Sequence, residues 1–152
     1  MLLAIDVGNS HTVFGLWNGK KWVATWRHRT DIEVTEDELA GWLFQMMEVE
    51  QLSGRISSVA CASVVPGFDR TLSQLARRYF QCEVKFLRGD SDHGIPIDYT
   101  PVNGVGADRI ANALAALDSY SAPIIVVDFG TATTFDVIDR DGHYSGGAIM
   151  AG

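Results

Sequence analysis

The sequence predicts an α/β fold in which helices flank a mixed β-sheet and in which one folding unit occurs twice. Short apolar runs that end in glycine or polar turn residues predict strands, and segments with apolar residues at helical spacing predict helices between them. A similar stretch occurs at residues 4–10 and again at 126–132. Each copy has two apolar residues, an aspartate, a further hydrophobic residue and a glycine, which indicates an internal repeat.

Three strands in a meander are predicted to open the chain, followed by helices and strands in alternation. The run Leu2–Val7 is apolar and closes at Gly8, and Asn18-Gly19 is a common hairpin dipeptide. Thr35 and Glu38 form a capping-box pattern that predicts the start of a helix. We expect strands at 2–7, 11–17, 21–28, 57–65 and 82–87, and helices after Thr35, from Pro66 and over 106–120.

The pattern of strand, glycine and strand then restarts. Strands are predicted at 123–129 and 131–138, and a third strand begins at Tyr144 after the turn at Asp141-Gly142. We therefore expect a first domain over 1–120 and the opening strands of a second domain over 121–152. No crossover helix follows these strands, and residues 147–152 are apolar, so we expect the chain to be a fragment with a truncated second copy.

The composition excludes several classes of function. The formal net charge is -7 and no dense Lys/Arg cluster is present, so we expect no nucleic-acid partner. The apolar start meets Asp6 too soon for a signal-peptide core, and no apolar run approaches the length of a membrane span. We therefore expect a cytoplasmic protein with no membrane partner.

Two predicted hairpins carry residues that suit phosphate groups, Asp6–Ser10 and Asp128–Thr134. An aspartate at a strand end followed by a tight turn brings backbone N–H groups and short polar side chains to one point, with the carboxylate available to a metal ion or its water. Taken singly, the first hairpin is better explained as an ordinary turn stabilised by Asp and Asn, and the second is likewise unspecific. In a duplicated unit, the two hairpins are predicted to face each other across a cleft and to clamp the phosphates of a nucleotide.

A third group of candidates lies around the glycine-rich loop 88–105 and the helix that follows it. Asp108 falls in the first turn of this helix, where it is either a cap of the helix or a general base that accepts a proton. Arg109 can pair with a carboxylate through two hydrogen bonds. Tyr99 is an aromatic residue in a loop, and such residues more often serve packing than binding.

Five motifs occur in an order that resembles the type III pantothenate kinases, and the resemblance covers the whole chain. The two hairpins also resemble the phosphate loops of the wider superfamily of acetate and sugar kinases, heat-shock 70 proteins and actin. Ser10 replaces the usual threonine of the first loop, and a proline that often precedes Gly152 is absent. The motifs are Asp6-Val7-Gly8-Asn9-Ser10, Tyr99-Thr100-Pro101, Gly106-Ala107-Asp108-Arg109, Asp128-Phe129-Gly130-Thr131-Ala132-Thr133 and Gly146-Gly147.

The resemblance implies a duplicated ribonuclease H-like (actin-like) fold and ATP-dependent phosphorylation of pantothenate to 4′-phosphopantothenate, the first step of coenzyme A biosynthesis. It implies that Asp108 is the general base and that pantothenate contacts Tyr99, Gly106, Ala107, Asp108 and Arg109. It implies ATP with Mg²⁺, a monovalent cation (K⁺ or NH₄⁺) at Asp128, and a magnesium contact at Asp6. The implied contacts to ATP are Asp6, Val7, Gly8, Asn9, Ser10, His11, Thr12, Val13 and Thr131.

Three other functions stay open at this point, and one of them is that of a filament-forming relative of actin. Another small-molecule kinase of the superfamily, such as a sugar kinase, would share the fold and the phosphate loops, although Tyr99 together with 106–109 favours pantothenate. A non-catalytic nucleotide-binding regulator is the second, and the presence of Asp108 speaks against it.

Assembly is predicted from the helix over 106–120. Its apolar positions include Ile110, Ala113, Leu114 and Leu117, and alanines make its other faces small. A helix that is apolar or small nearly all round is usually buried on more than one side. We therefore expect this helix to lie at the interface of a homodimer, although the remainder of the second domain could cover it instead.

Overall fold

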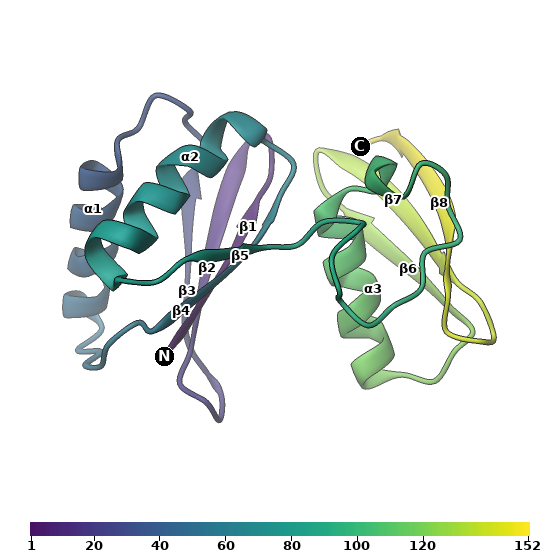
Figure 1. Cartoon of the computed structure of the whole chain (residues 1–152), viewed down its shortest axis with the longest axis horizontal. Coiled ribbons are helices and arrows are strands. Elements are labelled where there is room, and N and C mark those ends of the chain that lie inside the picture. Colours follow the sequence, from purple (N-terminus) through teal and green to yellow (C-terminus); the bar gives the residue numbers. More distant parts are fainter. The chain divides into compact units, whose positions relative to one another are not determined.

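The computed structural model describes all residues from 1 to 152, which divide into two compact units, 1–86 and 87–152. It confirms the predicted α/β fold and the order of its elements (Figure 1), with ends that differ from the predicted ones by one or two residues. The first unit contains β1 (Leu2–Val7), β2 (His11–Trp17), β3 (Trp22–Arg29), α1 (Glu36–Val49), β4 (Ser58–Ser63), α2 (Pro66–Leu75), the π-helical turn η1 (Ala76–Phe80) and β5 (Val84–Phe86). The second contains the short 3₁₀ helix η2 (Val102–Gly104), α3 (Ala107–Ser119), β6 (Ile124–Phe129), β7 (Ala132–Ile138) and β8 (Tyr144–Ala151).

The first unit is built on a mixed five-stranded sheet in the order β3-β2-β1-β4-β5. β1 lies at its centre, antiparallel to β2 and parallel to β4. The meander β1-β2-β3 supplies the antiparallel half, and the connections through α1 and α2 supply the parallel half. Asp6 consequently lies between Val13 and Ala62 on the two neighbouring strands, close to the edge of the sheet where β1 ends.

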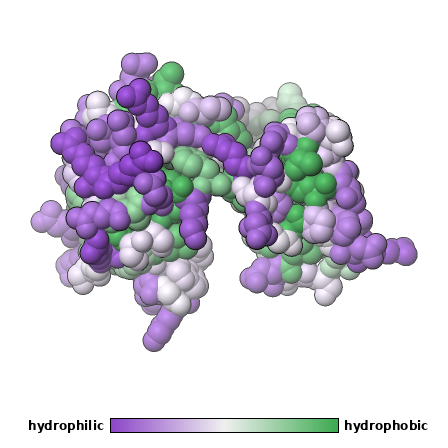
Figure 2. All heavy atoms as spheres, in the orientation of Figure 1, coloured by the Kyte–Doolittle hydropathy of each residue, from purple (hydrophilic) through white to green (hydrophobic).

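One face of this sheet forms the hydrophobic core, because alternate residues of a strand point to opposite faces. Leu3, Ile5 and Val7 of β1 are buried, whereas Asp6 between them is exposed. Both α1 and α2 lie against the core face (Figure 1), and hydrophilic side chains cover most of their outer side (Figure 2). The helical residues buried in this core are Leu39, Ala40, Leu43, Met47, Phe68, Leu72 and Leu75.

The helix starts follow the predicted local signals. The Thr35 hydroxyl accepts from the Glu38 N–H at 3.3 Å, and the Glu38 carboxylate accepts from the Thr35 N–H at 2.9 Å, which completes the capping box. The Thr35 N–H and the Thr35 hydroxyl, which donates to the same carboxylate at 2.8 Å, both lower the pKa of Glu38, because they favour its charged form. α2 begins at Pro66, a position where the missing N–H costs nothing.

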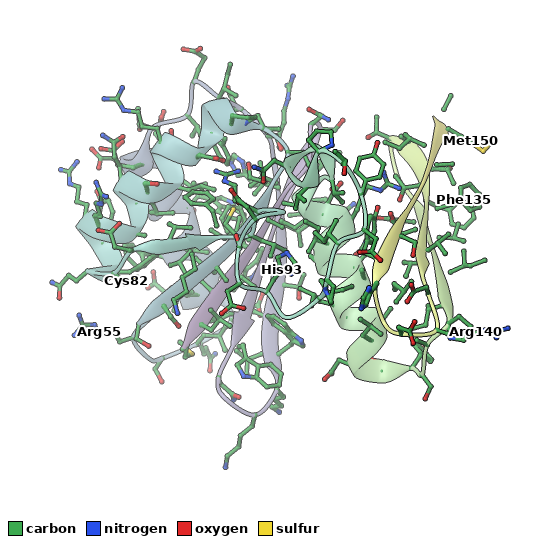
Figure 3. The ribbon with its side chains drawn as sticks, turned by 45° about the vertical axis from the view of Figure 1, so that its right-hand side comes forward. Arg55, Cys82, His93, Phe135, Arg140 and Met150 are labelled. Atoms are coloured by element: carbon green, nitrogen blue, oxygen red, sulfur yellow. The ribbon has the colours of Figure 1, made fainter.

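The second unit is an antiparallel three-stranded sheet, β6-β7-β8, with α3 packed against one face. The face of the sheet opposite α3 carries Val127 next to its partner Phe135 on β7. The same face carries Phe129 and Met150, which pair with Thr133 from its two sides. That face is exposed: Ile125 is 67%, Phe129 82% and Met150 58% accessible. Phe135 and Met150 point away from α3 in Figure 3. The second unit therefore presents an open apolar sheet face.

Both copies of the repeated stretch form hairpins. The Gly8 N–H donates to His11 O and the Gly130 N–H to Ala132 O, each at 3.0 Å. The second turn is one residue shorter, because Val7 pairs with Thr12 whereas Phe129 pairs with Thr133. The repeat is therefore a repeat of structure as well as of sequence.

α3 packs with the strands that follow it and belongs to the second compact unit. α3 contacts β6 and β7, and the boundary between the compact units falls between Phe86 and Leu87. The predicted domains 1–120 and 121–152 follow the repeat instead of this packing, and they stay a prediction. None of the helices combines the length and the apolar character that crossing a bilayer requires.

Candidate functional site

The first hairpin turns at Gly8–Ser10. A Cβ atom on Gly8 would lie 3.1 Å from His11 O, so glycine permits this close approach of the chain. Asp6, Ser10 and His11 are exposed, whereas Val7 and Thr12 point into the core. Any contribution of Val7 or Thr12 to ligand binding would therefore come from the backbone.

Thr30, which the sequence analysis missed, holds this hairpin from the end of β3. Its hydroxyl donates to Gly8 O at 2.7 Å, and its N–H donates to Ser10 O at 3.0 Å. The hydroxyl of buried Thr12 lies 2.9 Å from that of Thr30, and it must donate because the Thr30 proton is already directed to Gly8. Thr30 thus fixes two carbonyl groups of the turn. The sequence pattern that could have predicted this role is a threonine directly after a strand that pairs with β2.

The second hairpin places Asp128 next to two polar groups that the sequence analysis also missed. Asn112 of α3 donates its Nδ2 to Asp128 Oδ2 at 3.0 Å. Thr134 lies directly across from Asp128 on β7, and its hydroxyl oxygen is buried without a hydrogen-bond partner. A carboxylate beside an unpaired hydroxyl supplies the oxygen ligands that hard cations prefer. The ligand atoms of these residues are therefore of the type that the implied monovalent cation requires.

The structure places Asp108 in the first turn of α3 but not at its cap. Gly106 is the N-cap residue and makes no side-chain cap. Asp108 is partly buried, and its Oδ1 accepts from the Arg109 N–H at 2.8 Å. A carboxylate there is favoured by the partial positive charge of a helix start. The second oxygen, Oδ2, is not part of this bond and could accept a further proton.

Arg109 is held by a buried acidic partner. Its Nε donates to Asp136 Oδ1 at 2.7 Å and its Nη2 donates to Phe135 O at 3.1 Å. The Arg109 side chain is 13% exposed and that of Asp136 is fully buried. Tyr144 donates its hydroxyl to the same Asp136 oxygen at 2.5 Å. Burial, together with this bond to a carboxylate, raises the pKa of Tyr144.

The glycine pair of β8 makes room for this group. A Cβ atom on Gly147 would overlap Phe135 O and crowd the Arg109 guanidinium. Gly146 has φ +112°, which favours glycine, and a Cβ atom there would lie 3.4 Å from the Tyr99 ring. The structure therefore brings Tyr99, Arg109 and the Gly146-Gly147 motif together, although they come from a loop, a helix and a strand.

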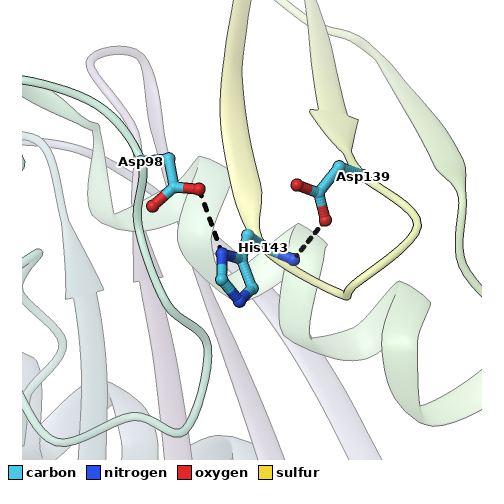
Figure 4. A group of neighbouring side chains, drawn as sticks. All are labelled: Asp98, Asp139 and His143. Atoms are coloured by element: carbon cyan, nitrogen blue, oxygen red, sulfur yellow. Dashed lines mark hydrogen bonds and ion pairs between the residues drawn. The ribbon is translucent and has the colours of Figure 1, made fainter.

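A second polar cluster joins Asp98 of the loop 88–105 to the turn between β7 and β8, which carries Asp139 and His143 (Figure 4). His143 Nδ1 lies 3.0 Å from Asp98 Oδ2, and this bond raises the pKa of His143. Asp139 Oδ1 accepts the N–H groups of Asp141 and His143, each at 2.9 Å, and the pKa of Asp139 is lowered. Potential ligand atoms of Asp98, Asp139 and His143 lie within 4.8 Å of one another. The ion pair and the turn account for their placement without a metal ion.

Comparison with known proteins matches residues 2–152 to the family described as type III pantothenate kinase. A curated relative of that description from Paramagnetospirillum magneticum is 50% identical over 155 aligned residues, which cover 100% of this chain and 59% of the relative. The chain spans about 60% of the length of the curated relatives that it matches.

Solved structures support the fold. A protein assigned as a 2-dehydro-3-deoxygalactonokinase from Sinorhizobium meliloti is 13% identical and superposes with a TM-score of 0.55, over 98% of this chain and 53% of that one. A protein assigned to the Baf family of transcriptional activators from Campylobacter jejuni is 19% identical, with a TM-score of 0.52 over 99% and 54%. At these identities the likeness concerns the actin-like fold alone.

The bonds of Thr30 generate a prediction about stability. Thr30→Val keeps the shape of the side chain but leaves the buried Thr12 hydroxyl without its acceptor and Gly8 O without its donor. We expect a loss of about 2 kcal/mol in the free energy of unfolding, measured by urea denaturation. Thr30→Ser should restore most of this loss. Thr25→Val, at an exposed position of β3, is the matched control, and an equal effect of both valine variants would contradict the assigned role.

Proposed function

The chain belongs to the type III pantothenate kinase family, and on that premise we propose that the full-length protein transfers the γ-phosphoryl group of ATP to the primary hydroxyl group of pantothenate. The product would be 4′-phosphopantothenate, which opens coenzyme A biosynthesis. The observation that carries the proposal is the family match over residues 2–152, which includes Tyr99, Asp108, Arg109 and both hairpins. Since the chain spans about 60% of its relatives, the proposal and its tests concern the full-length protein.

The first hairpin is proposed to bind the phosphates of ATP through its backbone N–H groups and the side chains of Asn9, Ser10 and His11. Thr131 of the second hairpin would add a hydroxyl. Mg²⁺, when bound at Asp6, supplies positive charge that offsets the charge of the phosphates. Catalysis of phosphoryl transfer is mostly positioning and charge neutralisation, so a rigid turn held by Thr30 suits this role.

Asp108 is proposed to accept the proton of the attacking hydroxyl group. Its Oδ1 is engaged by the Arg109 N–H, which fixes the orientation of the carboxylate. Arg109 is proposed to bind the carboxylate of pantothenate, and the bonds to Asp136 and Phe135 leave its Nη1 for that contact. Tyr99, 44% exposed beside Gly146, would form an aromatic wall of the pocket, with Gly106 and Ala107 at the start of α3.

Two alternatives are separated by one assay. A sugar kinase would use the same fold, and a regulator would bind nucleotide without transfer. A protein assigned as a transcriptional activator shares the fold, so the fold does not separate regulation from catalysis, and the presence of Asp108 counts against the second alternative. Incubation of the full-length protein with labelled ATP and either pantothenate or a panel of sugars decides between them. We further propose that the protein acts in the cytoplasm.

Asp108→Asn tests the general base. Because the amide cannot accept the proton, we expect kcat to fall about 10²-fold or more while the fold is kept. Steady-state kinetics and thermal denaturation measure the two effects. Asp118→Asn, on an exposed turn of the same helix, is the matched control and should change neither. Near-normal turnover with a lower melting temperature would instead give Asp108 a purely structural role.

The proposed cation site predicts a requirement for K⁺ or NH₄⁺. A carboxylate beside a triphosphate needs a cation to offset the repulsion between like charges. We expect activity to fall when Na⁺ replaces K⁺, and Asp128→Ala to lose both the activity and its dependence on the salt. Equal rates of the unaltered protein in the two salts would reject the site.

A homodimer with α3 at the interface is the last part of the proposal. Ala115 is exposed on α3 and Ala111 is partly exposed, so one side of the helix is small and accessible. We expect Ala115→Glu to shift the full-length protein from dimer to monomer in sedimentation velocity and to weaken pantothenate binding, since α3 also carries Arg109. Ser119→Glu, exposed at the end of α3, is the control. A monomeric unaltered protein at micromolar concentration would overturn the dimer.

A further inference from the structure

We infer that Asp136 and Tyr144 position Arg109, so that recognition of the acidic group of the substrate depends on two residues that do not touch it. This inference rests on the proposed function, which assigns the substrate carboxylate to Arg109. Neither residue belongs to the motifs that predicted the site. Both are buried, and Arg109 Nε and the Tyr144 hydroxyl donate to the same oxygen, Asp136 Oδ1.

The bonds at Asp136 fix the guanidinium group of Arg109. Nε donates to Asp136 and Nη2 donates to Phe135 O, so the plane of the group is defined by two different acceptors. The Tyr144 hydroxyl in turn restrains the carboxylate at 2.5 Å. An arginine with a fixed plane loses less freedom on binding than one that moves freely in solvent. Nη1, which takes part in neither bond, is then presented in one direction.

A contribution to folding stability is a poor explanation for the buried pair of Arg109 and Asp136. Asp136 is fully buried, and its second oxygen, Oδ2, has no hydrogen-bond partner. Burying a charge is costly even when it is paired, and well-packed apolar residues often serve stability equally well or better. A buried carboxylate with one unsatisfied oxygen is therefore better explained by what it does to Arg109.

Tyr144 also connects Arg109 to the loop that carries Tyr99. Its N–H donates to Pro96 O and its carbonyl accepts from the Asp98 N–H, each at 2.9 Å. Its ring is buried while its hydroxyl reaches Asp136. One residue thus sets the position of the loop through its backbone and the position of Arg109 through its side chain. Replacing only the hydroxyl separates the two effects, because the backbone bonds remain.

The kinetic test uses Tyr144→Phe in the full-length protein. We expect KM for pantothenate to rise about ten-fold, with kcat changed by less than about two-fold, because a misdirected Arg109 weakens substrate binding. In an Arg109→Lys background the same substitution should change KM by less than about two-fold, since the group it orients is gone. Tyr79→Phe, which removes a similar Tyr–Asp bond at 2.6 Å to Asp37, is the matched control and should change nothing. Equal effects of Tyr144→Phe in both backgrounds would overturn the inference.

A second measurement does not depend on activity. The Arg109 Nε–H signal in the NMR spectrum, assigned by its loss in Arg109→Lys, should be slow to exchange with solvent, and exchange should quicken in Tyr144→Phe and in Asp136→Asn. Unchanged exchange in Tyr144→Phe would overturn the inference even if Asp136→Asn fails to fold. If the unaltered protein does not phosphorylate pantothenate, the proposed function fails, and this signal alone decides whether Tyr144 and Asp136 position Arg109.

Discussion

The alternation of side chains along a strand is the constraint on which both candidate phosphate hairpins depend. In β1, burial of Ile5 and Val7 against the helices forces Asp6 onto the opposite face of the sheet. In β6, Asp128 likewise occupies the face opposite to Val127 and Phe129. A glycine follows each strand and lets the chain turn immediately, so each aspartate stands beside the backbone N–H groups of a tight turn. The chemistry of both hairpins is thus a consequence of which face is buried.

The same constraint explains the exposed apolar face of the second unit. Ile125, Val127 and Phe129 correspond in the repeat to Leu3, Ile5 and Val7, which α1 and α2 cover in the first unit. α3 lies on the other face of β6-β7-β8, the face that carries Asp128 and Asp136. An open apolar sheet face of this kind is typical of a surface that packs against another part of a protein or against a partner.

The polar group around Arg109 is of a different kind, because no single segment contains it. Arg109 lies in the first turn of α3, Asp136 lies within β7 and Tyr144 begins β8, so the group exists only when these elements pack together. Gly147 contributes by lacking a side chain, which lets the guanidinium approach Phe135 O. The proposed pocket is therefore built from side chains whose positions depend on the packing of α3 against the sheet.

Local sequence patterns predict the elements, the capping box at Thr35, the repeat and the two hairpins in which an aspartate is followed two residues later by a glycine. They do so because strand alternation, capping and turn chemistry act over a few neighbouring residues. The ordered motifs also led to the family. Contacts between elements determine that Thr30 holds the first turn and that Asn112 and Thr134 flank Asp128. The structure also shows that Gly106, and not Asp108, is the N-cap residue of α3, and that α3 packs with β6 and β7. The contacts of Thr30, Asn112 and Thr134 join residues from different elements, which local patterns do not encode. The buried ion pair of Arg109 with Asp136 joins residues 27 positions apart, so it depends on which strand the helix covers.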